Sequence, residues 1–169
     1  QEVAGIDLVS DGELQRDNMI DYFAEKLAGV QIDPGSKRSY YDFYDSVVRG
    51  KLGTAALGLA DEVRFLKRFA QRPAKVSVSG PHTLVKRIRN QHYPTDQDYY
   101  VALAEAMHEE YKAIVNAGLL VQIDDPRLAT HYDRHPDLGI EDCRRFIATQ
   151  VEIINHALRG IPMDRVRFH

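Results

Sequence analysis

The sequence contains little cysteine, no excess of basic residues and no long apolar run, and each shortage excludes a class of protein. Cys143 is the only cysteine among 169 residues, so no disulfide can form within the chain, and a reducing, cytoplasmic setting is predicted. The 22 Lys and Arg are fewer than the 25 Asp and Glu, and the resulting net charge of −3 argues against nucleic-acid binding. No apolar run approaches the length of a membrane span, and the start does not read as a signal peptide, so no membrane role is predicted.

What is present predicts one α/β domain. Apolar residues make up 44% and charged residues 28% of the chain, which is enough to bury a core. Short β-branched runs at residues 6–9, 75–78, 119–123 and 166–168 predict strands. Helical spacing of apolar residues predicts helices over 61–70, 99–117 and 140–158. Because strands and helices alternate, we expect βαβ units and a parallel sheet.

Residues 28–58 interrupt this alternation. The segment is rich in glycine and holds four aromatic residues in five positions, namely Tyr40, Tyr41, Phe43 and Tyr44. A connection of this length inside a compact α/β domain is usually functional or disordered. We interpret it as an excursion at the rim of a pocket or a lid; a hairpin-like ornament or an oligomer contact explains it equally well.

Polar residues follow the predicted strands, and in parallel α/β folds the carboxyl ends of the strands form the functional face. These residues are Asp11, Glu13, Ser79, Asp124, Asp125 and His169. Asp11 is explained most simply as a cap of the next helix. Glu13 could likewise be explained without a ligand, by an ion pair with Arg16. Two strands that both end in an acid are harder to explain by capping, so Glu13 and Asp124 together favour ligand binding.

Four blocks of sequence then point to a known family. They are residues 4–16 (AGIDLVSDGELQR, followed by Met19 and Tyr22–Phe23), 78–83 (VSGPHT), 121–126 (VQIDDP) and 166–169 (VRFH). In order and spacing they resemble the catalytic barrel of cobalamin-independent methionine synthases and their short single-barrel relatives.

The resemblance implies an α/β fold of the (βα)8 TIM-barrel type. Residues 1–169 would form a fragment of that single domain, roughly strands two to five with their helices, and 28–58 would lie at the pocket rim. Open sheet edges in such a fragment predict self-association, and we expect the chain to be inactive alone.

The resemblance also implies a zinc-dependent S-methyltransferase that moves a methyl group from 5-methyltetrahydrofolate to the thiol of homocysteine. Glu13 and Asp124 would hold the amino group of the thiol substrate, with Ser79 and Asp11 as further substrate-binding residues. His169 would be the first zinc ligand. The family's next ligand is a cysteine two residues later, and the remaining ligands are expected beyond residue 169.

Two departures from the family pattern keep alternatives open. Arg87 stands where the long methionine synthases carry a tryptophan against the folate, and Asp11 stands where they carry a histidine, as in the short relatives. One alternative is therefore another zinc-dependent thiol alkyltransferase, such as an epoxyalkane:coenzyme M transferase. A non-catalytic α/β module, whose acids serve only caps and ion pairs, is the alternative from another class.

Overall fold

A parallel sheet of four strands forms the centre of the molecule. The computed structural model describes residues 1–40 and 42–169, so Tyr41 of the aromatic group lies outside the described residues. The strands are β1 (Val9–Ser10), β4 (Ala74–Ser79), β6 (Leu120–Asp124) and β7 (Val166–Phe168), in the order β1-β4-β6-β7. All three pairings are parallel, which confirms the predicted α/β class. The sheet is open, with β1 and β7 as its edges, so it does not confirm a closed barrel.

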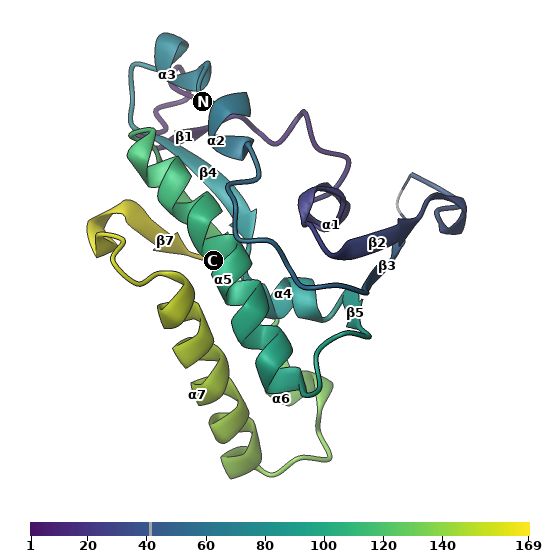
Figure 1. Ribbon diagram of the computed structural model, residues 1–169. Helices are drawn as coiled ribbons and strands as arrows, with labels where there is room; N and C mark the ends of the chain where they lie inside the picture. The colour runs from purple at the N-terminus through teal and green to yellow at the C-terminus, as the bar shows by residue number, and fades with distance from the viewer. Residues whose placement is uncertain (41) are drawn as a thin grey trace.

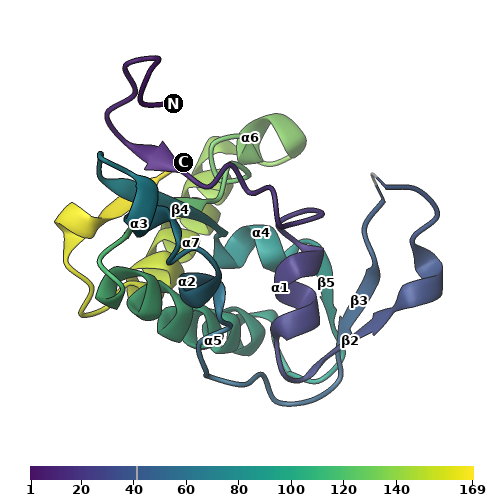
Figure 2. The same ribbon diagram turned by 90° about the horizontal axis from the view of Figure 1, so that it is seen from above.

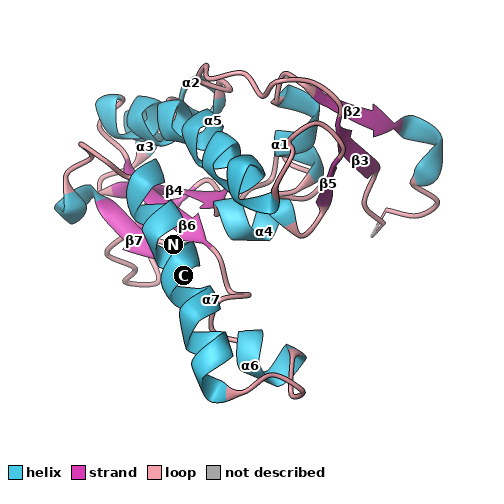
Figure 3. Ribbon diagram, turned by 60° about the horizontal axis from the view of Figure 1, so that its bottom comes forward, coloured by secondary structure: helices cyan, strands magenta, loops and turns pink. Residues whose placement is uncertain are grey.

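Two long helices, α5 (Asp96–Asn116) and α7 (Ile140–Ala157), pack against each other beside this sheet (Figures 1 and 3). Helix α5 begins where the Thr95 hydroxyl accepts a hydrogen bond from the amide of Asp98 at 3.1 Å, an N-cap that leaves one fewer amide unpaired. It ends before Gly118, whose φ of +79° favours glycine. Among the described residues, no helix combines the length and hydropathy needed to cross a membrane.

The two faces of the sheet differ in chemistry because side chains alternate along each strand. On β4 and β6 the apolar positions Val76, Val78, Val121 and Ile123 are fully buried and belong to the same core cluster as the apolar residues of α5. Apart from Leu120, the alternate positions are polar, and they are Lys75, Ser77, Ser79, Gln122 and Asp124. One face therefore stabilises the fold, and the other is free to carry a site.

A second, smaller sheet takes two of its three strands from the segment 28–58, for which the sequence predicted no strands. It consists of β2 (Val30–Asp33), β3 (Asp45–Val48) and β5 (Ile88–Asn90), with β2 and β3 antiparallel and β3 and β5 parallel. The hairpin loop includes a 3-10 turn at Pro34–Ser36 and projects from the molecule on the side away from the large sheet (Figure 2). Helices α1 (Asp21–Lys26) and α4 (Pro81–Val85) lie between the two sheets (Figure 2).

The remaining helices are short. The single helix predicted over 61–70 is two, α2 (Leu59–Glu62) and α3 (Leu66–Phe69), separated by a turn at residues 63–65, and Phe69 is 74% exposed. Helix α6 (His131–Arg134) precedes α7, and a 3-10 turn at Met163–Arg165 precedes β7.

A buried carboxylate fixes the end of the excursion. Glu110 on α5 is fully buried and accepts hydrogen bonds from three backbone amides, those of Leu57, Gly58 (3.1 Å) and Ala60 (3.2 Å). These amides lie at the beginning of α2, where a helix has amides without partners of its own. Glu110 therefore connects the excursion to the core.

We predict that Glu110→Ala lowers the free energy of unfolding by about 2–3 kcal/mol, because buried amides lose their acceptor. The neighbouring Glu109 is the control: its side chain is 39% exposed and lies 3.8 Å from His108 and 3.9 Å from Lys112, so Glu109→Ala should cost less than about 0.5 kcal/mol. Urea denaturation measures both values, and equal effects would contradict the role given to Glu110.

Candidate functional site

The loop after β1 has a backbone conformation that non-glycine residues rarely adopt. Gly12 and Glu13 both have positive φ angles, +73° and +61°, and Glu13 is the only non-glycine residue with positive φ among those described. A side chain in this left-handed region costs roughly 1 kcal/mol or more, and such residues cluster at functional sites. The loop turns back through a hydrogen bond from the Arg16 amide to the Glu13 carbonyl at 3.0 Å.

Arg16 holds this loop against the sheet. Its guanidinium is 1% exposed, and its Nη1 donates to the carbonyl of Ser77 on β4 at 2.8 Å. Its Nη2 lies 3.6 Å from Glu13 Oε2 and 3.9 Å from Asp11 Oδ2. The ion pair between Glu13 and Arg16 is therefore present, whereas Asp11 caps no helix: it accepts from Gln15 Nε2 at 2.6 Å, and α1 begins only at Asp21.

The polar face of the sheet continues from Ser77 to the last residue of the chain. Gln122 Nε2 donates to Asp124 Oδ1 at 2.8 Å and lies 3.3 Å from Ser77 Oγ. His169 Nδ1 lies 3.1 Å from the same Asp124 oxygen. The contacts thus run without interruption from the β1 loop to the end of β7, and they bring Glu13, Asp124 and His169 to one rim.

Ser79 lies on the same face, but its hydrogen bonds go to Met19 and Tyr111. It pairs with Asp124 in the β4–β6 register. Its hydroxyl donates to the Met19 carbonyl at 3.0 Å, and its carbonyl accepts from the Tyr111 hydroxyl at 3.0 Å. Burial is the main cause that raises the pKa of Tyr111 well above its ordinary value, so this hydroxyl remains a donor and Ser79 keeps a fixed position.

A second acid beside the rim has a structural role that the sequence did not reveal. Asp125 is fully buried and accepts from the Thr83 hydroxyl at 2.6 Å and from the His82 amide at 3.2 Å. Gly80 makes room for it, because a Cβ atom at residue 80 would lie 2.4 Å from Asp125 Oδ2. Asp125 therefore joins the beginning of α4 to the end of β6. The one available sequence signal was the glycine before Pro81.

The donor set supports only part of a zinc site. His169 is well suited to be one ligand, because a carboxylate that holds one imidazole nitrogen commonly orients a histidine whose other nitrogen binds the metal, and Asp124 contacts Nδ1. Nowhere in residues 1–40 and 42–169 do three or more His, Cys, Asp or Glu side chains form a group that could hold a metal ion. Cys143 is buried on α7.

Three histidines and a phenylalanine form a ring cluster between α4, α6 and α7. His131 stacks on Phe146 with ring centroids 4.0 Å apart, and His135 and His82 contact the same pair at 4.6 and 5.4 Å. Burial first, and then the charges of His135, His82 and Lys86, lower the pKa of His131 below 6.5. The cluster therefore packs best with His131 neutral.

Comparison with known proteins assigns the chain to a class, the catalytic domains of cobalamin-independent synthases. The family model described as the catalytic domain of cobalamin-independent synthase matches residues 1–136. The methionine synthase of Sulfolobus acidocaldarius is 31% identical over 162 residues, an alignment that covers 94% of this chain and 44% of the relative. The methionine synthase of Sulfurisphaera tokodaii is 30% identical over 164 residues, covering 95% and 45%.

Two solved structures of methionine synthases are similar to this chain in fold. The chain is similar to a B12-independent methionine synthase from Shewanella sp. W3-18-1 in complex with selenomethionine, with a TM-score of 0.71, 27% identity and coverage of 95% of this chain and 45% of that one. A putative vitamin-B12 independent methionine synthase from Listeria monocytogenes shares the fold with a TM-score of 0.76 at 23% identity, over 100% and 50% of the two chains.

The chain belongs to the cobalamin-independent methionine synthase family, as the resemblance of its four sequence blocks indicated. It spans a little under half the length of the curated relatives that it matches.

We predict that His131 makes stability depend on pH. Because its folded pKa is below its ordinary value of 6.5, the unfolded chain binds more protons just below pH 6.5, and stability falls as the pH decreases through that window. His131→Phe keeps the ring stack and should flatten the dependence of the thermal midpoint between about pH 7 and pH 5. His92→Phe, at an exposed histidine, should leave the slope as it is; an unchanged slope in His131→Phe would contradict the assignment.

Proposed function

We propose that this chain forms part of the catalytic domain of a zinc-dependent methyltransferase that transfers a methyl group to the thiol of homocysteine and yields methionine. The observation that carries the proposal is the continuous polar rim, in which Glu13, Asp124 and His169 are joined through Arg16, Ser77 and Gln122. The names of the related methionine synthases support the same reaction.

The two acids are suited to the amino group of an amino-acid substrate. Asp124 is 8% exposed, and an ammonium group that meets a carboxylate in so dry a setting forms a strong, charge-assisted hydrogen bond. Glu13 is more open, with a side chain 36% exposed, and one of its oxygens lies near Arg16, so the carboxylate is oriented and still accessible. In this proposal Ser79 and Asp11 shape the rim, through Met19 and Arg16 respectively.

His169 supplies one side of the proposed metal site. Asp124 accepts the proton of Nδ1, and this contact leaves Nε2 as the nitrogen that can bind a metal. A bound zinc ion would hold the substrate thiol as a thiolate, the reactive nucleophile at neutral pH. Because catalytic zinc takes about three protein ligands, we expect the other ligands in the part of the relatives that this chain does not span.

The acceptor thiol is better explained as an amino acid than as a sulfonate such as coenzyme M. A sulfonate bound beside Glu13 would need an accessible cation there, but the Arg16 guanidinium is buried and shared between Glu13, Asp11 and the Ser77 carbonyl. The remaining groups at the rim include two carboxylates, which would repel a sulfonate and attract an ammonium group. We keep 5-methyltetrahydrofolate as the predicted methyl donor.

Binding of methionine, the expected product, tests the proposal. Calorimetric titration should show that the chain binds methionine and selenomethionine but not coenzyme M. Glu13→Gln and Asp124→Asn should each weaken methionine binding by about tenfold or more, because each removes one charge-assisted contact. Asp7→Asn is the matched control, since the Asp7 carboxylate is 88% exposed and lies 3.6 Å from Arg72; its affinity should equal that of the unaltered chain.

The opposite results are equally clear. If methionine does not bind, or binds all four chains alike, the rim is not an amino-acid site, and the non-catalytic alternative is favoured. A preference for coenzyme M over methionine would instead support the other class of thiol alkyltransferase.

A further inference from the structure

The amide of Gln122 can support the rim in only one of its two orientations. Its Nε2 donates to Asp124 Oδ1 at 2.8 Å and lies 3.3 Å from Ser77 Oγ. A glutamine amide carries donors at one end and an acceptor at the other, so a half-turn would set Oε1 against the carboxylate of Asp124. Two acceptors repel each other, and Asp124 would then turn away from His169. A group that fixes the direction of this amide therefore also fixes the rim.

Lys75 is placed to fix that direction. It lies opposite Leu120 in the β4–β6 register, so Gln122, two residues further along β6, is its diagonal neighbour on the polar face of the sheet. The Lys75 ammonium group donates to Gln122 Oε1. An ammonium group has donors only, so it can bond only to the oxygen end of the amide, and it keeps Nε2 on the side of Asp124.

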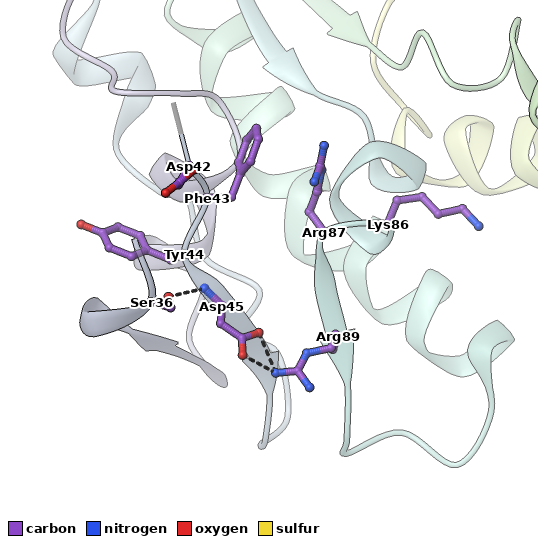
Figure 4. Close-up of a pocket in the computed structure, with 8 residues that line it drawn as sticks. All are labelled: Ser36, Asp42, Phe43, Tyr44, Asp45, Lys86, Arg87 and Arg89. Atoms are coloured by element: carbon purple, nitrogen blue, oxygen red, sulfur yellow. Dashed lines mark hydrogen bonds and ion pairs between the residues drawn. The ribbon is translucent and has the colours of Figure 1, made fainter. Parts of the chain in front are cut away.

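Cations elsewhere on the molecule are held differently. In the hollow between the β2–β3 hairpin and the segment that joins α4 to β5, Arg89 pairs with Asp45 at 2.6 and 2.7 Å, and Arg87 lies over the ring of Phe43 (Figure 4). Lys75 is instead partly buried, and within the described part of the chain no carboxylate lies within 4 Å of its ammonium group. Partial burial of a charge without an acid beside it costs free energy, and a role in positioning the rim would account for that cost.

The contacts lead from Lys75 to the last residue of the chain. Asp124 Oδ1 accepts from Gln122 Nε2 and lies 3.1 Å from His169 Nδ1. Asp124 is only 8% exposed, and hydrogen bonds in series polarise one another in such a setting. The hydrogen bond that one ring nitrogen of a histidine makes decides which nitrogen carries the proton. A carboxylate held at Nδ1 therefore keeps the proton there and leaves Nε2 without one.

We propose that Lys75 is a positioning residue of the rim: through Gln122 it holds the Asp124 carboxylate against His169 Nδ1, and so it sets the tautomer of His169. The relay Lys75–Gln122–Asp124–His169 is carried by the contacts above. Its purpose, which is to present Nε2 to a metal and Asp124 to the amino group of the substrate, rests on the proposed function.

Long-range ¹H–¹⁵N NMR of the His169 ring tests the relay in the ¹⁵N-labelled chain, at about pH 8, where an ordinary imidazole is neutral. His169→Gln assigns the signals. The unaltered chain should carry the proton on Nδ1. Lys75→Met keeps the length of the stem and removes the donor, so part of the population should move to the Nε2–H form, and calorimetry should show methionine binding weakened about threefold to tenfold.

Two further lysine variants make the measurement specific. Lys75→Arg keeps a cationic donor and should retain the Nδ1–H form. Lys112→Met is the matched control, because the side chain of Lys112 is 53% exposed and lies 3.9 Å from Glu109; it should change neither the tautomer nor the affinity. Thermal midpoints close to that of the unaltered chain show that each variant is folded.

A double-mutant cycle tests whether Lys75 acts through Gln122. Gln122→Leu should weaken the Nδ1–H form by itself, and Lys75→Met should then have no further effect in the Gln122→Leu background. Effects that simply add would overturn the relay. So would an unchanged tautomer in Lys75→Met, or a Lys75→Arg variant that loses the Nδ1–H form as fully as Lys75→Met. If the double variant does not fold, the tautomers of the single variants decide.

The same samples separate this proposal from the proposed function. An Nδ1–H form that depends on Lys75, in a chain that does not bind methionine, leaves the relay standing and removes the proposed function. Methionine binding together with a tautomer that does not respond to Lys75→Met removes only the relay.

Discussion

The pairing register between β4 and β6 is the constraint on which the rim depends. It sets Ser77 opposite Gln122 and Ser79 opposite Asp124, and the next pairing sets Gln122 opposite Arg167 and leads to His169. Side chains alternate along a strand, so a shift of one residue would turn the polar side chains into the core and expose the valines. The apolar packing of Val76, Val78, Val121 and Ile123 against the helices therefore also determines where the polar groups lie.

Much of this architecture could be predicted from the sequence, because its signals are local and periodic. Three of the four β-branched runs become β4, β6 and β7, and the stripes over 99–117 and 140–158 become α5 and α7. The run at 6–9 is wrong except at its end, because only Val9 belongs to a strand, β1 (Val9–Ser10). The small sheet could not be predicted in this way. Residues 30–33 and 45–48 carry only a short alternation, and β5 is three residues long; such strands exist because they pair with one another, and pairing between distant segments leaves no local signal.

The candidate site shows the same division. The order of strands predicted that Glu13, Asp124 and His169 would meet at one edge, and the structure brings them to one rim. Of the residues that connect them, Arg16 was predicted to pair with Glu13, but neither its burial nor the role of Gln122 was predicted. Gln122 interrupts an apolar run, a visible signal, but its role requires knowing that Ser77 is its neighbour across the sheet. Arg16 is buried, although a sequence gives no reason to place an isolated arginine in a protein interior.

An ion pair with Arg16 does not fully explain the conformation of Glu13. An ion pair with Arg16 could be made by a glutamate in ordinary backbone conformation, yet Glu13 has a φ of +61°, where glycine would avoid a cost of roughly 1 kcal/mol. The Arg16 contact at 3.6 Å is also too long for a hydrogen bond, so it offsets little of that cost. The result is a carboxylate that is partly exposed and lies 3.6 Å from a buried guanidinium. That arrangement would suit the proposed recognition of an ammonium ion from solvent, and this proposed role would account for the strain better than the ion pair alone.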